Sequence, residues 1–384
     1  MKLKSRPEDF RVEEKLRLEL RKRGRYAVYQ VEKRYWNTLD VIRELEHKYR
    51  LQRVSRAGLK DRYSLSTQFL SALPGGPRAI KEKNFSAVLV GHSDEPVSRD
   101  ILLGNRFTIV LRALRDSEAQ AVLNNMPLVK TQGFPNYYDE QRVGSARHGQ
   151  GFIARKLIAG HYNGALKLLA ATPSALDDRQ VRRSRTLVAE NWGDWQKCLP
   201  HVDYQARPAF KHLAKRKSDF KGAVKLLPRT MLELFINAYQ AWLWNETLSG
   251  VLARLKLARY RLGYSQGEFS FYDRLTPRQL KYLLNLTIPA PAPSALTQSD
   301  RVAEVMNEVL CREGLELKDL RLKLRLRSLF FKSWDRSAVV VPRNCNVSQP
   351  KPDELYPGRS KLTLGFFLPP GSYATMVTKR LTLG

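Results

Sequence analysis

The chain has 384 residues, of which 43% are hydrophobic, enough to bury a large core and to form two domains. Its 67 lysines and arginines outnumber 37 aspartates and glutamates, and the formal net charge of +30 predicts a polyanionic partner such as a nucleic acid. The composition excludes a disulfide framework, a zinc ribbon and a membrane-spanning chain, because the three cysteines lie far apart and no apolar stretch approaches the ~20 residues that span a bilayer.

The beginning of the chain, MKLKSRPEDF, has no apolar core of a signal peptide. The six histidines are not paired at metal-ligand spacing. The sequence therefore predicts a cytoplasmic, reduced protein without a bound metal.

The first third of the chain predicts strands around one helix. The helix is expected over residues 37–51, with Thr38 as its N-cap and Val41 and Leu45 on its apolar face. Strands are expected at three places: residues 10–35, 85–92 and 106–114. Together these elements indicate an α+β layout.

From about residue 155 the strand signals fade. Residues 154–170 and 228–255 predict helices, and a loop rich in proline and alanine interrupts the helical part at residues 288–300. Strand character returns at residues 320–331. This order predicts a discontinuous domain formed by residues 1–154 and 325–384, with a mainly helical domain inserted at residues 155–324.

The segment 320–331 alternates between leucines and cations. In a strand, one face would contain four cations: Arg321, Lys323, Arg325 and Arg327. Two roles stay open for them. They would either block aggregation at a sheet edge or contact the phosphates of a nucleic acid.

One short motif places a single carboxylate between two cations. In AGLKDR, Asp61 lies between Lys60 and Arg62, just after a glycine. By itself this pattern is typical of a solvated turn, and only its context indicates a chemical role.

Six separated segments provide that context, and they occur in a fixed order. They are RPEDFRVEE (6–14), the long segment 37–68 that contains AGLKDR, LGNRFTIVLR (103–112), FPNYYDEQRVG (134–144), AYQAWLWN (238–245) and FFLPPGSYATMVTKRL (366–381). In this order they resemble the TruD family of tRNA pseudouridine synthases, the tRNA pseudouridine(13) synthases. The resemblance implies a pseudouridine synthase fold of class α+β, a mixed, largely antiparallel sheet with flanking helices, and an inserted, mainly helical TRUD domain.

The resemblance implies an isomerase that converts a specific uridine of tRNA, U13, to pseudouridine after the base has been flipped out of the RNA. Two alternatives stay open. The target could be another tRNA position, ribosomal RNA or mRNA, or the chain could be a non-catalytic RNA-binding protein on the same fold. The family implies tRNA as partner and a reaction that needs no cofactor. We further expect a monomer that binds neither a metal nor a membrane.

The family's essential carboxylate corresponds to Asp61, the candidate catalytic residue. A carboxylate could attack C1′, attack C6, or remove a sugar proton to give a glycal, and the sequence does not choose among these routes. Lys60 and Arg62 would keep Asp61 ionised, and one of them would contact the phosphate beside the target nucleotide.

Further substrate-binding candidates follow from the resemblance. They are Phe10, Asn136, Tyr373, Lys4 and Tyr138. The rings are suited to stacking on uracil, and the amide of Asn136 could read the uracil edge. Each residue also has a structural alternative, as a core ring, a turn or strand residue, or a flexible terminal lysine. The sequence differs from the family pattern at Val143, where an aromatic ring is usual, and the segment 249–300 matches nothing recognisable.

Overall fold

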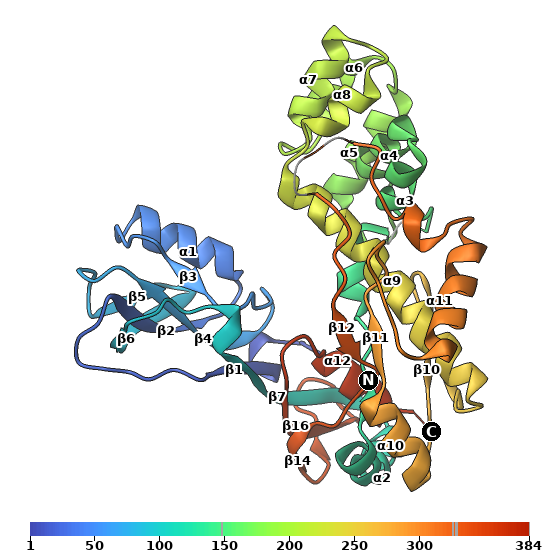
Figure 1. Ribbon diagram of the computed structural model, residues 1–384. Coiled ribbons are helices and arrows are strands. Elements are labelled where there is room, and N and C mark those ends of the chain that lie inside the picture. Colours follow the sequence, from blue (N-terminus) through green and yellow to red (C-terminus); the bar gives the residue numbers. More distant parts are fainter. Residues whose placement is uncertain (147–148, 325, 327–328, 384) are drawn as a thin grey trace. The chain divides into compact units, whose positions relative to one another are not determined.

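The computed structural model describes residues 1–146, 149–324, 326 and 329–383 (Figure 1). The chain divides into two compact units, each with its own core. Unit 1 comprises Met1–Phe134 and Val340–Gly384, and unit 2 comprises Pro135–Val339.

Unit 1 is built on one mixed, mostly antiparallel sheet. Its strands within the described residues are β1 (Phe10–Leu16), β2 (Tyr26–Lys33), β3 (Ser55–Arg56), β4 (Leu65–Ala72), β5 (Ala79–Lys81), β6 (Phe85–Ser93), β7 (Leu102–Leu114), β14 (Arg343–Val347), β15 (Lys351–Pro352) and β16 (Ser360–Leu368). The order is β14-β16-β7-β1-β4-β2-β6-β5, with β15 beside β16 and β3 beside β4. Of the described pairings, only β1 with β4 is parallel. The expected fold class is confirmed.

Three helices cover parts of this sheet. They are α1 (Thr38–His47), α2 (Asp116–Gln132) and α12 (Ala374–Leu381), and two short 3-10 turns are η1 (Pro7–Asp9) and η2 (Arg99–Ile101). The apolar face of α1 packs on β2 and β4 through Val41 and Leu45, both fully buried with Val31. The helix α2 packs against α12, β14 and β16. The strands β6 and β7 and the helix α1 therefore lie where the sequence predicted them.

The start of α1 differs from the prediction by one residue. The N-cap is Asn37, whose N–H donates to Asp40 Oδ2 (3.4 Å). Thr38 is the first helical residue and is fully buried. Its hydroxyl donates to Gln68 Oε1 on β4 (3.0 Å), which removes the side chain from the capping position.

Unit 2 is mainly helical. Its helices within the described residues are η3 (Glu140–Ala146), α3 (Ile153–Ala159), α4 (Tyr162–Ala170), α5 (Arg179–Glu190), α6 (Trp195–Cys198), η4 (Leu199–His201), α7 (Arg207–Lys215), α8 (Phe220–Lys225), α9 (Arg229–Arg254), α10 (Pro277–Asn285), α11 (Asp300–Arg312) and η5 (Leu317–Asp319). The long helix α9 contacts η3, α3 and α11, as Figure 1 shows for α11. The predicted helix over 154–170 is interrupted at Gly160, whose φ of 78° is left-handed and ends α3.

Two short antiparallel pairs were not expected in the helical part. They are β9 (Tyr260–Tyr264) with β10 (Gly267–Phe271), and β11 (Thr287–Pro289) with β12 (Asp335–Ser337). The remaining strands, β8 (Phe134–Pro135) and β13 (Val339–Val340), occur where the chain passes from one unit to the other. The predicted domain boundaries, after residue 154 and before residue 325, both fall within unit 2, since η3 packs on α9 and β12 pairs with β11.

The strand expected at residues 320–331 is wrong for the described part of that segment. Its backbone forms local turns, in which Leu320 N–H donates to Leu317 and Arg321 N–H to Asp319. These local hydrogen bonds occupy backbone N–H groups that would otherwise bond to a neighbouring strand. Arg321 and Lys323 are exposed outside any strand, and Arg325 and Arg327 lie outside the described residues. Within the described ranges, no helix is long and apolar enough to cross a membrane.

Candidate active site

Asp61 lies in the loop between β3 and β4 of unit 1. Its side chain is about one-third exposed (34%), and its Oδ2 accepts a hydrogen bond from Lys4 Nζ at 2.7 Å. Such a contact between an ammonium and a carboxylate is a charge-assisted hydrogen bond. The carboxylate is thus held beside a cation while solvent still reaches it.

Lys4 joins two of the residues that the sequence singled out. The same ammonium lies 4.4 Å from the centre of the Phe10 ring, on the first strand. Phe10 is 4% exposed and its ring meets Phe107 edge-on, with centroids 6.0 Å apart. Lys4 itself has a left-handed backbone, with φ of 56°. The structure therefore brings Lys4, Phe10 and Asp61 together, and it places Phe10 in the core rather than on an open surface.

A buried ion-pair network fixes the N-terminal segment that contains Lys4. Arg112 on β7 donates to Asp9 in η1 and to Asp353 Oδ1, both at 2.8 Å. All three side chains are at most 5% exposed. The hydrogen bond that Arg112 donates to Asp9, and those that it donates to Glu354 and Asp353, raise the pKa of Arg112 despite its burial. The guanidinium therefore stays charged and ties η1 to the C-terminal part of unit 1.

The structure corrects the role expected for Lys60. Its ammonium is 6% exposed and pairs with Glu14 Oε1 on β1 at 2.5 Å. Its N–H donates to the hydroxyl of Thr38 (2.9 Å). A buried, paired ammonium does not reach the phosphate of a bound RNA, so Lys60 holds the loop instead.

Arg62, on the other side of Asp61, is exposed. Its Nε donates to the carbonyl of Tyr35 (2.9 Å), and its guanidinium lies 5.7 Å from the centre of the Tyr63 ring. This contact leaves the other guanidinium N–H groups for a phosphate oxygen.

The sequence reasoning missed two buried charged residues next to this loop, Lys33 and Glu14. Lys33 Nζ donates to the carbonyl oxygen of Asp61 (2.8 Å). Glu14 pairs with Lys60 and also accepts the N–H of Phe69 at 3.0 Å. Lys33 lies on β2 and Glu14 on β1, each on the core-facing side of its strand, where the preceding residues on that side are apolar. A charge at a core-facing position of a strand was the signal that could have identified them.

Asn136 and Tyr138 belong to unit 2 and lie close together. Asn136 Nδ2 donates to the carbonyl of Ser337 (3.1 Å), and its Oδ1 accepts from Arg336 (2.9 Å). The Arg336 guanidinium in turn covers the Tyr138 ring at 4.0 Å. Tyr138 is 6% exposed, and its N–H donates to Asn245 of α9 (2.9 Å). Tyr138 thus packs in the core of unit 2.

Tyr373 is the N-cap residue of α12 in unit 1 and is half-buried. Its extended backbone ends the loop after β16, and its carbonyl accepts the N–H of Met376 (3.1 Å). The position agrees with the loop motif GSYAT from which it was singled out.

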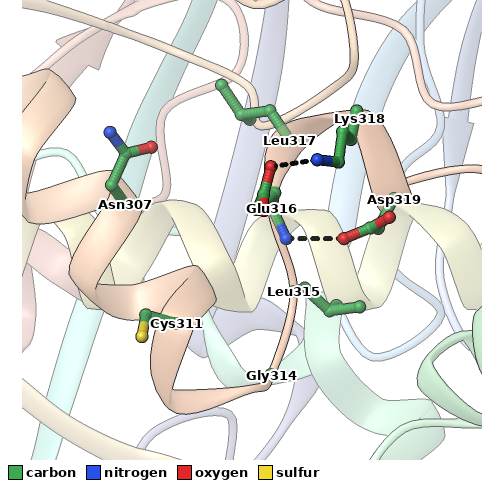
Figure 2. A pocket seen from close by; sticks show the side chains of 8 residues that line it. All are labelled: Asn307, Cys311, Gly314, Leu315, Glu316, Leu317, Lys318 and Asp319. Atoms are coloured by element: carbon green, nitrogen blue, oxygen red, sulfur yellow. Dashed lines mark hydrogen bonds and ion pairs between the residues drawn. The ribbon is translucent and has the colours of Figure 1, made fainter.

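A hollow of about 600 Å³ lies in unit 2, at the end of α11 and in the loop that follows. Figure 2 shows its lining, which contains none of the candidate site residues. Its charged groups bond to one another: Lys318 pairs with Glu316 (2.7 Å), and Glu316 N–H donates to Asp319 (2.9 Å). In the parts of the chain that are described, no cluster of three or more histidine, cysteine or acidic residues could hold a metal ion.

Comparisons with known proteins give the family. The family model for TruD, tRNA pseudouridine synthase D, matches residues 1–265. A probable tRNA pseudouridine synthase D 1 from Methanococcus maripaludis is 32% identical, with 99% of each chain covered. A tRNA pseudouridine synthase D from Aquifex aeolicus is 28% identical over 99% of this chain and 98% of its own length.

A solved structure agrees with these relatives. The crystal structure of a putative tRNA pseudouridine synthase D from Methanosarcina mazei superposes with a TM-score of 0.73 and 25% identity, and the match covers 99% of this chain and 93% of that one. The match extends through both units and includes the mixed sheet. The chain belongs to the TruD family of tRNA pseudouridine synthases, and it is an isomerase of that class.

Proposed function

We propose that this enzyme converts U13 of tRNA to pseudouridine and that Asp61 is its catalytic carboxylate. The observation that supports the role of Asp61 is the contact with Lys4, which holds a partly exposed carboxyl group in place and also lies over the Phe10 ring. The position U13 rests on the family resemblance.

The reaction is an isomerisation whose atoms balance without a redox partner. The N1–C1′ bond of the uridine breaks, the base turns, a C5–C1′ bond forms, the proton on C5 is lost and N1 gains one. Asp61 would act on C1′, on C6 or on a sugar proton, and it or a neighbouring group would transfer the C5 proton. We propose that no metal or cofactor takes part.

The substrate-binding roles are part of the same proposal. Phe10 and Tyr373 supply rings near the flipped base, and Arg62 contacts the adjacent phosphate. The side-chain amide of Asn136 donates one N–H to Ser337 and accepts one hydrogen bond from Arg336. Its second N–H and the second lone pair of its oxygen would bond to the uracil edge. Tyr138 supports Asn136 through Arg336.

The proposal also covers the catalytic domain, the oligomeric state and the location of the enzyme in the cell. Unit 1 would be the catalytic domain, since it contains Asp61, Lys4, Phe10 and Tyr373. The enzyme would act as a monomer in the cytoplasm. Light scattering of the purified protein and of its mixture with tRNA would measure its oligomeric state, and fractionation of cells would locate it.

The test compares Asp61→Asn with wild type on a tRNA transcript, in the presence of a chelator and without added nucleotide. We expect no pseudouridine from the variant and nearly unchanged RNA affinity, because phosphate contacts elsewhere provide most of the binding energy. Substantial turnover by the variant would refute the role of Asp61. A matched transcript with cytidine at position 13, together with pseudouridine mapping on total RNA from cells with and without the gene, tests the position.

A further inference from the structure

Lys33 occupies a place where an apolar side chain would be expected. It ends β2, in which Ala27, Tyr29 and Val31 face the core, and alternation turns Lys33 to the same side. It is 1% exposed. Burying an ammonium costs several kcal/mol unless it is well bonded, so packing alone does not account for a lysine here.

The side chain of Lys33 bonds to the backbone of two loops. Its Nζ donates to the carbonyl oxygen of Trp36, just before α1, and to that of Asp61, both at 2.8 Å. The Asp61 carbonyl also accepts the hydroxyl of Ser64 (2.9 Å). The peptide group after Asp61 is thus fixed by two buried donors.

Two neighbouring contacts join the same two loops. Lys60 N–H donates to Thr38 Oγ1 (2.9 Å) on one side of Asp61, and Arg62 Nε donates to the Tyr35 carbonyl (2.9 Å) on the other. Lys33 adds a third contact between these loops, made to the backbone of Asp61 itself. The loop that contains the carboxylate is therefore held from the side of β2 and α1.

We propose that Lys33 is a positioning residue that sets the backbone, and through it the carboxylate, of Asp61 for the isomerisation. The inference rests on the proposed role of Asp61. A displacement of about 1 Å in a reacting group lowers the rate by about 100-fold, so the loss of this contact affects the chemical step rather than the binding of tRNA.

The contact does not require a charged lysine. Burial, with a smaller contribution from the charge of Lys60, lowers the pKa of Lys33 to about 8, against the opposing effects of Asp61 and Asp40. The neutral amine still has two hydrogens for the two carbonyls. The positioning by Lys33 therefore persists as its proton is lost above pH 8.

The test uses Lys33→Met, which keeps a long, unbranched side chain and removes the donors. We expect the single-turnover rate with saturating enzyme to fall about 10- to 100-fold, while the affinity for tRNA stays within twofold. The melting temperature should fall, since the Trp36 carbonyl loses its donor. The matched control is Lys15→Met, which removes one exposed cation from the same sheet and should keep the wild-type rate.

A second variant decides the outcome if Lys33→Met does not fold. Ser64→Ala removes the other donor to the Asp61 carbonyl and should lower the same rate several-fold without loss of affinity. Wild-type rates in the folded variants would overturn the inference. If Asp61→Asn is inactive while these variants react normally, only the role of Lys33 fails; if Asp61→Asn is active, the proposed function itself fails.

Discussion

At the scale of single residues, the site depends on which atoms face Asp61. The carboxylate of Asp61 accepts from Lys4 of the N-terminal segment, and the backbone carbonyl of Asp61 accepts from the side chain of Lys33 on β2. Both lysines are far from Asp61 in sequence. The cations that flank it in the chain have other contacts: Lys60 pairs with Glu14, and Arg62 bonds to Tyr35. Sequence proximity alone therefore does not indicate the contact between Lys4 and Asp61.

The Lys4 contact gives a prediction at this scale. Lys4→Met should lower the single-turnover rate about 10- to 100-fold, because the carboxylate loses the cation that orients it. The free energy of unfolding should change by less than about 1 kcal/mol, since the pair is partly exposed. Lys2→Met is the control, because Lys2 lies over the Tyr356 ring in the same segment and not against Asp61. Equal rates for the two variants would contradict the assigned contact.

At the scale of elements, Arg112 connects β7 with η1 and with the loop after β15. Asp353 accepts from Arg112 and from the N–H groups of Ala113 and Leu355. Burial by itself raises the pKa of Asp353, but these hydrogen bonds outweigh it and hold the pKa below its usual range. The stability that this carboxylate contributes is therefore complete above about pH 4, its unfolded value, and is lost as pH falls through the lower folded value.

Asp353→Asn should lower the free energy of unfolding at pH 7 by about 3 kcal/mol, because Arg112 loses one buried partner while Asp9 remains. Between pH 5 and 3 the variant should lose less stability than wild type. Thermal unfolding at several pH values measures both effects. The control is Glu19→Gln, whose carboxylate is 91% exposed. Identical slopes for Asp353→Asn and wild type would show that Asp353 does not titrate as described.

At the scale of the whole molecule, the net charge of +30 means that many cations lack an acidic partner, and the structure shows where some of them lie. On α5, Arg179 and Arg183 lie one turn apart and are exposed, and neither side chain has an ion pair within the described residues. By contrast, Arg254 on α9 pairs with Glu304 and Glu308. Unpaired cations on one helix face are suited to contact the phosphates of a tRNA.

Replacing Arg179 and Arg183 with glutamine should weaken tRNA binding and lower the salt slope of the logarithm of the binding constant by about one to two, as each lost phosphate contact removes ~0.7–0.9. The rate at saturating RNA should not change. Arg254→Gln, which removes a paired cation, should leave the slope as it is. Binding titrations at several salt concentrations measure the slopes, and an unaltered slope in the double variant would exclude α5 from the RNA contact.

The sequence by itself determined the features that local chemistry decides. Periodicity located α1, β6 and β7, because side chains repeat every two residues in a strand and every three to four in a helix. The order of the motifs identified the family, and the composition predicted a polyanionic partner. The segment 320–331 shows the limit of this approach, since alternating leucines predict a strand only if another strand is there to pair with it.

The tertiary structure decided which distant residues meet. The parallel pairing of β1 with β4 places Glu14 against Lys60, 46 residues away, and the end of β2 brings Lys33 to Asp61, 28 residues away. Nothing in the spacing of these residues encodes such contacts. Strand order determines which residues are neighbours in the core. A buried charge is stable only if one of these neighbours pairs with it or bonds to it, whatever their separation in sequence.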